Sequence, residues 1–185
     1  MGGVENSLRG QLLIASPALT DPNFFKTVIL VAEHTAEGAM GLVLNRRTPA
    51  AVSDAAPHLT SLGGIDASVW VGGPVDRGSV FVLADFEEPE EAGSIVLWDV
   101  GLLAHEVDPE LLEASTRQAR VFAGYAGWGP GQLEGELDDD AWIVEQPAET
   151  DIFTADPDRL WSAVLRRKGG QFAVIALMPD DPRLN

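Results

Sequence analysis

The sequence predicts an α+β fold built on a largely antiparallel sheet. Segments of strand character dominate the first hundred residues, whereas the two segments with the clearest helix signals begin at Asp108 and Asp156. Strands and helices do not alternate regularly, which argues against a doubly wound parallel sheet. The chain has 185 residues, 45% of them hydrophobic, which is the size and composition of one domain with its own core. We therefore expect a single domain over residues 1–185 with two to four helices.

Three apolar segments near the N-terminus are expected to be strands. Residues 11–15 form a short apolar run that ends at a Ser-Pro pair. Residues 27–32 are continuous and rich in β-branched side chains, as in a strand that is buried on both faces. Residues 40–44 follow a turn, so we expect them to pair with residues 27–32 as a hairpin.

The middle of the chain is less regular. Residues 46–64 are rich in Ala, Pro, Thr and Ser, and a short helix is expected within residues 51–62. Residues 69–71 and 80–83 flank a Gly-Gly-Pro loop, and together they are expected to form a second hairpin. A further strand is expected at residues 95–98.

Two helices have clear start signals. Asp108-Pro109 and Asp156-Pro157 each place a capping Asp before a Pro at the first helical position. Apolar residues at helical spacing extend the first helix to residue 120 and the second to residue 168. Arg117 and Arg120 are therefore expected near the C-terminal end of the first helix, where the helix dipole favours positive charge.

Between and beyond these helices the pattern indicates further elements. Residues 121–125 and 141–144 are expected to be strands, with a short helix starting at Pro130 or Gly131. Residues 172–177 alternate loosely between apolar and polar, so they fit either a last strand or a short helix.

The charge balance restricts the possible partners. The chain has 29 acidic and 12 basic residues, so its net charge is −17. Binding to nucleic acid or to an anionic membrane needs clustered Lys and Arg, and the clusters here are Arg46-Arg47 and Arg166-Arg167-Lys168. The second cluster is explained by the end of the second helix. We expect no direct nucleic-acid binding, no membrane association and, since no secretory signal is evident at the N-terminus, a cytoplasmic location.

The sequence lacks the residue patterns that most catalytic mechanisms require. The chain has no cysteine, which excludes thiolate catalysis, disulfides and cysteine-ligated metal sites. His34, His58 and His105 show no ligand pattern, so no metal and no other cofactor is expected, and His34 is expected to be a satisfied surface histidine. Glu134 and Glu136 are expected to belong to a solvated acidic turn and to diverge if they lie on a helix. No serine lies in a nucleophile elbow, and we assign no catalytic residue.

A glycine-rich segment is the best candidate site. Four of the residues from Gly124 to Gly131 are glycine, and they lie between an expected strand and an expected helix, where free backbone N–H groups can bind an anion. The spacing is not that of a dinucleotide-binding or P-loop motif, and the acidic residues that follow would repel phosphate. The alternative is a set of tight turns with Trp128 buried against the sheet, near the Gly72-Gly73-Pro74 loop.

One polar pair is a second candidate. Asn45-Arg46 ends an expected strand, and Arg46 has the geometry to bind a carboxylate or phosphate, or else to pair with a surface Asp. The residues expected to bind a ligand or partner are, along the chain, Asn45, Arg46, Gly127, Trp128, Gly129, Gln132 and Glu134.

Several sequence segments occur in a specific order and spacing. They are GQLLIA at 10–15 with Asp21-Pro22 and Phe24 after it, EGAMGLVLN at 37–45, GGPV at 72–75, GYAGWGPGQLE at 124–134, and Ala141-Trp142. Together they resemble the AlgH/YqgE family of bacterial proteins over roughly residues 8–165. The resemblance implies an α+β fold with coiled, bifurcated sheets, and one branch of the family carries a transcriptional-regulator label. It implies no catalytic residues.

Two classes of function remain. The first is a binding or regulatory protein that acts through protein partners or a small ligand, with an indirect effect on transcription as one route. The second is an enzyme whose pocket lies beside the loop from Gly127 to Glu134. The sequence favours the first class, because it lacks a nucleophile motif, a metal-ligand set and a cofactor motif.

Overall fold

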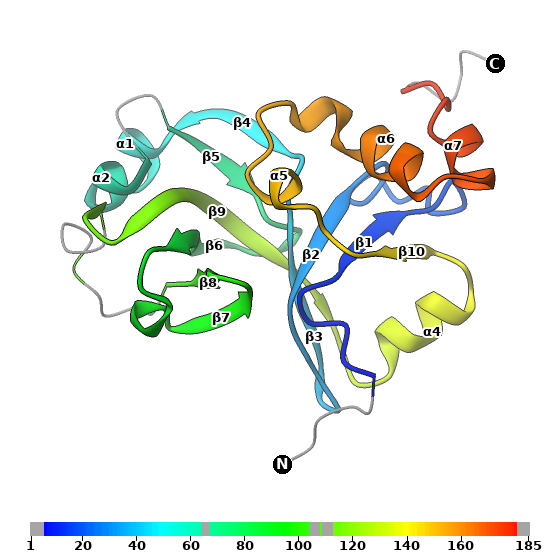
Figure 1. Ribbon diagram of the computed structural model, residues 1–185, viewed down its shortest axis with the longest axis horizontal. Coiled ribbons are helices and arrows are strands. Elements are labelled where there is room, and N and C mark those ends of the chain that lie inside the picture. The colour runs from blue at the N-terminus through cyan, green and yellow to red at the C-terminus, as the bar shows by residue number, and fades with distance from the viewer. Residues whose placement is uncertain (1–5, 64–66, 104–107, 109–112, 181–185) are drawn as a thin grey trace.

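The computed structural model describes residues 6–63, 67–103, 108 and 113–180, and its strands form one connected sheet system. The strands are β1 (Leu12–Ala15), β2 (Val28–Thr35), β3 (Gly38–Val43), β4 (Arg47–Ala51), β5 (Ser68–Val71), β6 (Val75–Phe86), β7 (Ser94–Leu97), β8 (Val100–Leu102), β9 (Thr116–Trp128) and β10 (Trp142–Glu145). Their order is β10-β1-β2-β3-β9-β6-β8-β7, and β4 attaches through β5, which pairs with β9. Figure 1 shows two halves that share the long strand β9.

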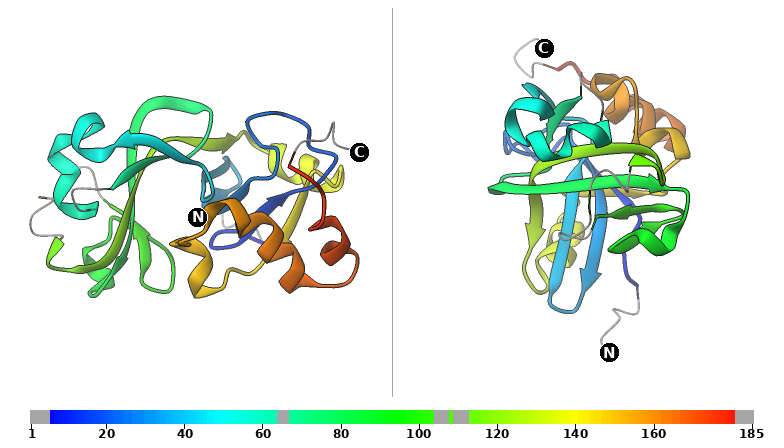
Figure 2. Two further views of the ribbon diagram at one scale, coloured as in Figure 1. Left: turned by 90° about the horizontal axis from the view of Figure 1, so that it is seen from above. Right: turned by 90° about the vertical axis from the view of Figure 1, so that its left-hand side faces the viewer.

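The helices surround these strands. They are α1 (Val52–Ala55), η1 (Pro57–Leu59), α2 (Thr60–Gly63), η2 (Pro89–Glu91), α4 (Gln132–Asp138), α5 (Glu149–Ile152), α6 (Pro157–Lys168) and α7 (Gln171–Ile175). In Figures 1 and 2, α1 and α2 lie at the far end of one half, whereas α6 and α7 cover the other. The expected helix over residues 157–168 is confirmed, and residues 171–175 are helix rather than strand.

One half, which we call sheet A, contains β10, β1, β2, β3 and the end of β9. It is antiparallel, and the expected hairpin of residues 27–32 and 40–44 is confirmed by the β2–β3 ladder. Alternate residues of β2 face different layers: Val28 and Leu30 pack in one cluster with Leu160 of α6, and Ile29 packs in another with Leu133 of α4. A helix therefore covers each face, and this explains why residues 28–32 are apolar without alternation.

The other half, sheet B, contains β4, β5, most of β9, β6, β8 and β7. Its apolar face packs against Val52, Leu59 and Leu62 of the α1–α2 region. The expected hairpin of residues 69–71 and 80–83 is wrong, because β9 lies between them: Val121 is opposite Val69 on one side and Val82 on the other. Since β5 runs parallel to β9 and β6 runs antiparallel to it, a local hairpin signal could not reveal this arrangement.

The expected helix over residues 108–120 is wrong in its second part. Residues 116–120 belong to β9, which forms a long ladder with β6, and residues 109–112 lie outside the described residues. Arg117 therefore does not complement a helix dipole; its guanidinium binds Asp85 at 2.7 Å and Asp99 at 2.8 Å. Pairing with a strand some thirty residues earlier outweighs the local helix propensity of this segment.

The two sheets separate at Gly124. Residues before it pair with β5 and β6, whereas Ala126–Trp128 pair with β3. Gly124 has φ +70°, and the backbone of Gly72 crosses it so closely that a Cβ on Gly72 would lie 2.2 Å from the Gly124 carbonyl oxygen. Gly72 also links both sheets, since its N–H donates to Ala123 and its carbonyl accepts from Val43. The largely antiparallel, bifurcated α+β fold is thus confirmed, and the Gly-Gly-Pro motif forms its crossing point.

Candidate functional site

The glycine-rich segment forms the end of β9 and the start of α4. Trp128 is 6% exposed, which confirms that it is buried, but its ring packs edge-on against Trp142 at 5.9 Å rather than on the Gly72-Gly73-Pro74 loop. Glu136 binds both indoles: its Oε2 accepts from Trp128 Nε1 at 2.9 Å and from Trp142 Nε1 at 2.7 Å. Sequence reasoning missed this carboxylate, because nothing local indicates that two indole N–H groups converge on it.

The first turn of α4 is held by its own side chains. Gln132 Oε1 accepts from the Gly129 N–H at 3.0 Å, and its Nε2 donates to Glu136 Oε1 at 3.0 Å. Glu134 points elsewhere, as expected for two positions on a helix, and its Oε1 lies 2.8 Å from His34 Nε2. Backbone hydrogen bonding, then the contact with His34, lowers the pKa of Glu134 below its usual value.

His34 is buried rather than on the surface, with 7% exposure. Its Nδ1 accepts the Leu8 N–H at 3.0 Å, so its Nε2 carries the proton that is donated to Glu134. The imidazole therefore joins the N-terminal segment to α4. A histidine inside β2 with both ring nitrogens bonded has a structural role, and its distant partners could not be found from the sequence.

Asn45 and Arg46 lie at the opposite end of β3 from Trp128. The Asn45 side chain accepts from the Val28 N–H at 3.0 Å and donates to the Lys26 carbonyl at 2.9 Å. Arg46 donates to the Phe25 carbonyl at 2.7 Å instead of pairing with an Asp, and burial lowers its pKa. Because β3 separates this pair from the loop by roughly 20 Å of strand, the structure brings the five loop residues together but not Asn45 and Arg46.

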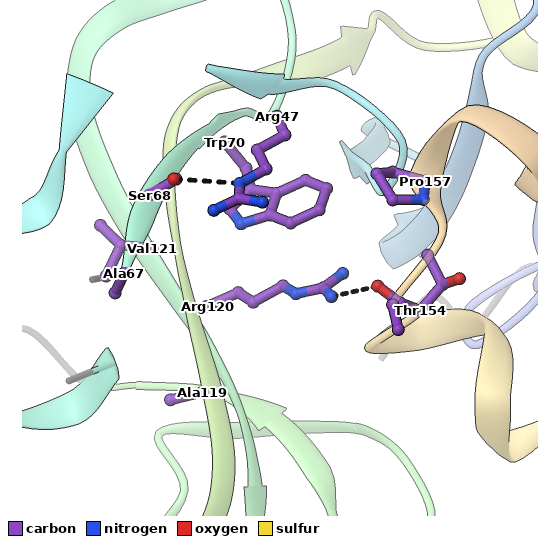
Figure 3. Close-up of a pocket in the computed structure, with 10 residues that line it drawn as sticks. Arg47, Ala67, Ser68, Trp70, Ala119, Arg120, Val121, Thr154 and Pro157 are labelled. Carbon is purple, nitrogen blue, oxygen red and sulfur yellow. Dashed lines mark hydrogen bonds between the residues drawn. The ribbon is translucent and has the colours of Figure 1, made fainter. Parts of the chain in front are cut away.

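A different cluster of side chains lines a cavity of about 270 Å³ where sheet B meets the start of α6. Arg47 and Trp70 are directly opposite each other on β4 and β5, and Trp70 is opposite Phe122 on β9. Arg120 is two residues before Phe122, so its side chain falls on the same face of the sheet as Trp70. Figure 3 shows the two arginine side chains beside the Trp70 ring, with Thr154 and Pro157 on the far wall.

Both arginines in this cavity are bound to neutral groups. Arg120 stacks on Trp70, with its Cζ 4.0 Å from the ring centroid, and it donates to the carbonyls of Ile152 and Thr154. Arg47 Nε donates to Ser68 Oγ at 3.0 Å (Figure 3). Among the described residues, neither guanidinium has a carboxylate within 4.0 Å. Within the described part of a chain of net charge −17, two cations thus lie together without an acidic partner.

Positive charge gathers at this cavity, and at Arg120 it is partly buried. Burial, and then the positive charge of Arg47, lower the pKa of Arg120 to about 10. Arg120 remains charged at neutral pH, and its burial in this state is unfavourable without a counter-charge. By contrast, Arg167 binds Asp151 at 2.6 Å, and that bond raises the pKa of Arg167. We call Arg47, Trp70, Arg120 and the wall at Thr154 and Pro157 the arginine pocket.

Sequence reasoning missed the arginine pocket because it placed Arg120 on a helix. Once residues 116–128 are read as a strand, strand alternation puts Arg120 and Phe122 on one face, which is the only local signal available. The proximity of Arg47 depends on β5 lying between β4 and β9, a long-range pairing.

Two further features are not found among the described residues. These residues contain no group of three or more His, Asp or Glu side chains arranged to hold a metal ion. Among their helices, none combines the length and apolar character required to span a bilayer.

The motifs that frame these features match a known family. A model of AlgH-like proteins matches residues 12–173, which includes the whole glycine-rich segment and the arginine pocket. The chain belongs to the AlgH-like family. The resemblance to AlgH/YqgE proteins is thereby confirmed. A UPF0301 protein of Streptomyces avermitilis is 44% identical over 186 residues, covering 97% of this chain and 96% of the relative. One of Mycobacterium tuberculosis is 36% identical over 182 residues, covering 93% and 88%.

Solved structures share this architecture. The solution structure of AlgH from Pseudomonas aeruginosa has a TM-score of 0.72 and 28% identity, covering 98% of this chain and 99% of that one. A crystal structure of a Corynebacterium diphtheriae protein has a TM-score of 0.83 and 24% identity, covering 95% and 94%, which supports the fold alone. The names of these relatives specify no reaction or ligand, so function has to be argued from the site.

Proposed function

We propose that this AlgH-like chain is a single-domain, cytoplasmic binding and regulatory protein, and that the arginine pocket receives an anionic group of a small molecule. One observation carries the proposal: Arg47 and Arg120 face a common cavity and have no carboxylate partner among the described residues. An anion placed between them would offset the burial of the Arg120 charge and the repulsion from Arg47, which together lower the pKa of Arg120.

The chemistry of the pocket suits a carboxylate or a phosphate. A guanidinium presents several N–H donors in a planar fork, which matches the two oxygens of such groups. Arg120 is held in place by its stacking on Trp70 and by two carbonyls, so little side-chain entropy remains to be lost when a ligand binds. The cavity of about 270 Å³ accommodates a small group rather than a whole macromolecule.

The pocket supports binding more than catalysis. The described residues of its lining include no Asp, Glu, His, Lys or Tyr, and its one serine hydroxyl already binds Arg47. General acid–base catalysis needs a group that exchanges a proton near the working pH, and Arg120 is not such a group, because it stays charged at neutral pH. A regulatory effect on transcription would be indirect, since the net charge of −17 opposes duplex binding.

Thermal unfolding with inorganic phosphate tests the proposal. At about ten times its dissociation constant, phosphate is expected to stabilise the fold by about 1.4 kcal/mol, or roughly 3–5 °C in Tm. Arg47→Met and Arg120→Met are each expected to abolish this shift. Arg166→Met is the matched control, since Arg166 is exposed on α6 and its loss changes the net charge equally. A shift of equal size in all three variants would indicate a general salt effect and contradict the proposal.

A further inference from the structure

A second concave site lies on the other side of the crossing point at Gly124. It is a groove of about 810 Å³ between the tip of the β2–β3 hairpin and the start of β6, with Gly127 and Trp128 of β9 contributing to its wall. In Figure 1 the hairpin tip is at the bottom of the molecule, between the β6–β8 strands and α4. Of the loop from Gly127 to Glu134, only Gly127 and Trp128 line this groove.

The groove has an apolar floor. Met40, Phe81, Leu102 and Tyr125 line it, and the rings of Phe81 and Tyr125 meet edge-on at 5.7 Å. Val75 stands at the rim with 37% of its surface exposed. These side chains come from β3, β6, β8 and β9, so both sheets build the floor. Such a surface favours a ligand that brings an apolar group of its own.

The rim of the groove is acidic. Glu33, Glu37 and Asp76 line it, and Glu33 and Glu37 are exposed at the hairpin tip. Within the part of the chain that the structure describes, none of the three has a basic group within 4.0 Å, and the lining includes no Lys, Arg or His. As far as the structure describes the chain, the rim charges therefore have no basic partner, and they surround an apolar floor on an open surface.

Asp76 is held at this rim by an unusual backbone conformation. Its φ of +43° is uncommon for a residue other than glycine, and its carboxylate accepts a hydrogen bond from the Ser79 hydroxyl. The four residues 76–79 form a bulge, because Val75 is opposite Tyr125 and Val80 is opposite Ala123. The bulge carries Asp76 out of the ladder and places it beside Val75 at the edge of the groove.

We propose that this groove binds a basic peptide segment of a partner protein, in which Lys or Arg residues flank a large apolar side chain. The basic residues pair with Glu33, Glu37 and Asp76, and the apolar side chain packs on Met40 and Phe81. The inference is independent of the anion bound at the arginine pocket, since the two sites have opposite charge and share no lining residue. The adaptable thioether of Met40 suits side chains of different shape.

Fluorescence anisotropy with defined peptides tests this proposal on the full chain. The probe is a labelled heptapeptide that alternates Lys or Arg with Leu or Phe. Two matched peptides accompany it, one with Glu in place of the basic residues and one with Ser in place of the apolar residues. The expected order of affinity is the basic apolar peptide first, the basic serine peptide several-fold weaker, and no binding by the acidic peptide.

Two double variants separate the groove from the general negative charge of the chain. Glu33→Gln with Glu37→Gln is expected to weaken the basic apolar peptide by about fivefold or more, as the loss of two exposed ion pairs allows. Glu87→Gln with Glu88→Gln changes the net charge equally at exposed positions outside the groove, and its effect is expected to stay below about twofold. Thermal melts of both variants should match the unmodified chain, because the altered side chains are exposed.

Three results would overturn the proposal. Equal weakening by both double variants would show diffuse attraction between a basic peptide and an acidic protein. Equal affinity for the leucine-containing and serine-containing peptides would show that the apolar floor takes no part. Absence of binding by the basic apolar peptide at about 1 mM, the weak end of specific recognition, would exclude the groove as a peptide site.

Discussion

The two ends of β9 border sites of opposite character. Near Arg120 the strand lines a small pocket with two guanidiniums, whereas from Tyr125 to Trp128 it lines a wide groove with an acidic rim. The first end pairs within sheet B, whereas the second pairs with β3 of sheet A from Ala126 onward. The bifurcation of the sheet therefore gives one strand two chemical environments only a few residues apart.

The two ends of β9 are stabilised in different ways. The end at Trp128 is held by burial, with Trp142 and the carboxylate of Glu136 around the indole. The end at Arg120 is held by a long ladder with β6, while its charged side chain is left without an acidic partner among the described residues. Substitutions at the Trp128 end should consequently change the stability of the fold, whereas substitutions at the Arg120 end should change the response to a ligand.

The largest expected effect is at the buried end. Trp128→Ala removes an indole that is 6% exposed and leaves Glu136 with one partner fewer, so it should lower the free energy of unfolding by about 3–5 kcal/mol. Trp98→Ala is the control, because Trp98 is 53% exposed, and its cost should stay below about 1 kcal/mol. Urea denaturation measures both. Equal stability of the Trp128 variant and the unmodified chain would remove the contrast between the two ends.

The second largest loss of stability is expected at Gly124, between the two ends of β9. Gly124→Ala forces a side chain into φ +70° and places a Cβ 2.6 Å from the Gly73 carbonyl oxygen, which should cost about 2–4 kcal/mol. Gly135→Ala is the matched control, since Gly135 is on α4 with no atom within 4 Å of an added Cβ. It should stabilise the protein by about 0.5–1 kcal/mol. If the two variants melt alike, the crossing at Gly124 tolerates a side chain.

At the Arg120 end of β9, we expect a smaller effect on stability and a response to ligand that depends on pH. Burial, and then the positive charge of Arg47, lower the pKa of Arg120 to about 10 in the folded chain, so the cost of burying its charge is present at neutral pH and is relieved as the pH rises above 10. Stabilisation by phosphate should therefore be larger at pH 8 than at pH 10.5, as differential scanning fluorimetry can show. Arg120→Met should remain within about 1 kcal/mol of the unmodified chain without phosphate. A phosphate effect that does not change with pH would argue against Arg120 as the binding group.

The smallest effect is expected at the contact of Glu134 with His34. The pKa of Glu134 is lowered, so its stabilising contribution is present at neutral pH and is lost as the pH falls below the ordinary glutamate value of about 4.3. The side chain is 47% exposed, which limits the effect to a few tenths of a kcal/mol. Glu134→Gln should be slightly less stable at pH 7 and equal to the unmodified chain near pH 3. A difference that persists in acid would indicate a packing role instead.

The sequence predicts sheet A better than sheet B for a physical reason. The β2–β3 hairpin and α6 are specified by neighbouring residues: an apolar run, a turn, a proline and a pair of glycines. The first half of β9 instead depends on partners far along the chain, and its residues 116–120 favour a helix when considered alone. The arginine pocket is hard to predict from the sequence for the same reason, because β4, β5 and β9 must be aligned before Arg47 and Arg120 lie close together.

The shared strand also has a consequence for synthesis of the protein. Strands β3, β5 and β6 all pair with β9 in the folded protein. Because β9 follows all three in the sequence, it leaves the ribosome after them. At about 5–20 residues per second, the edges of these strands stay unpaired for several seconds in the nascent chain. Such edges readily pair with other chains. A truncation before residue 116 should therefore give an aggregating fragment rather than a folded half, and a growing chain is expected to need protection until β9 emerges.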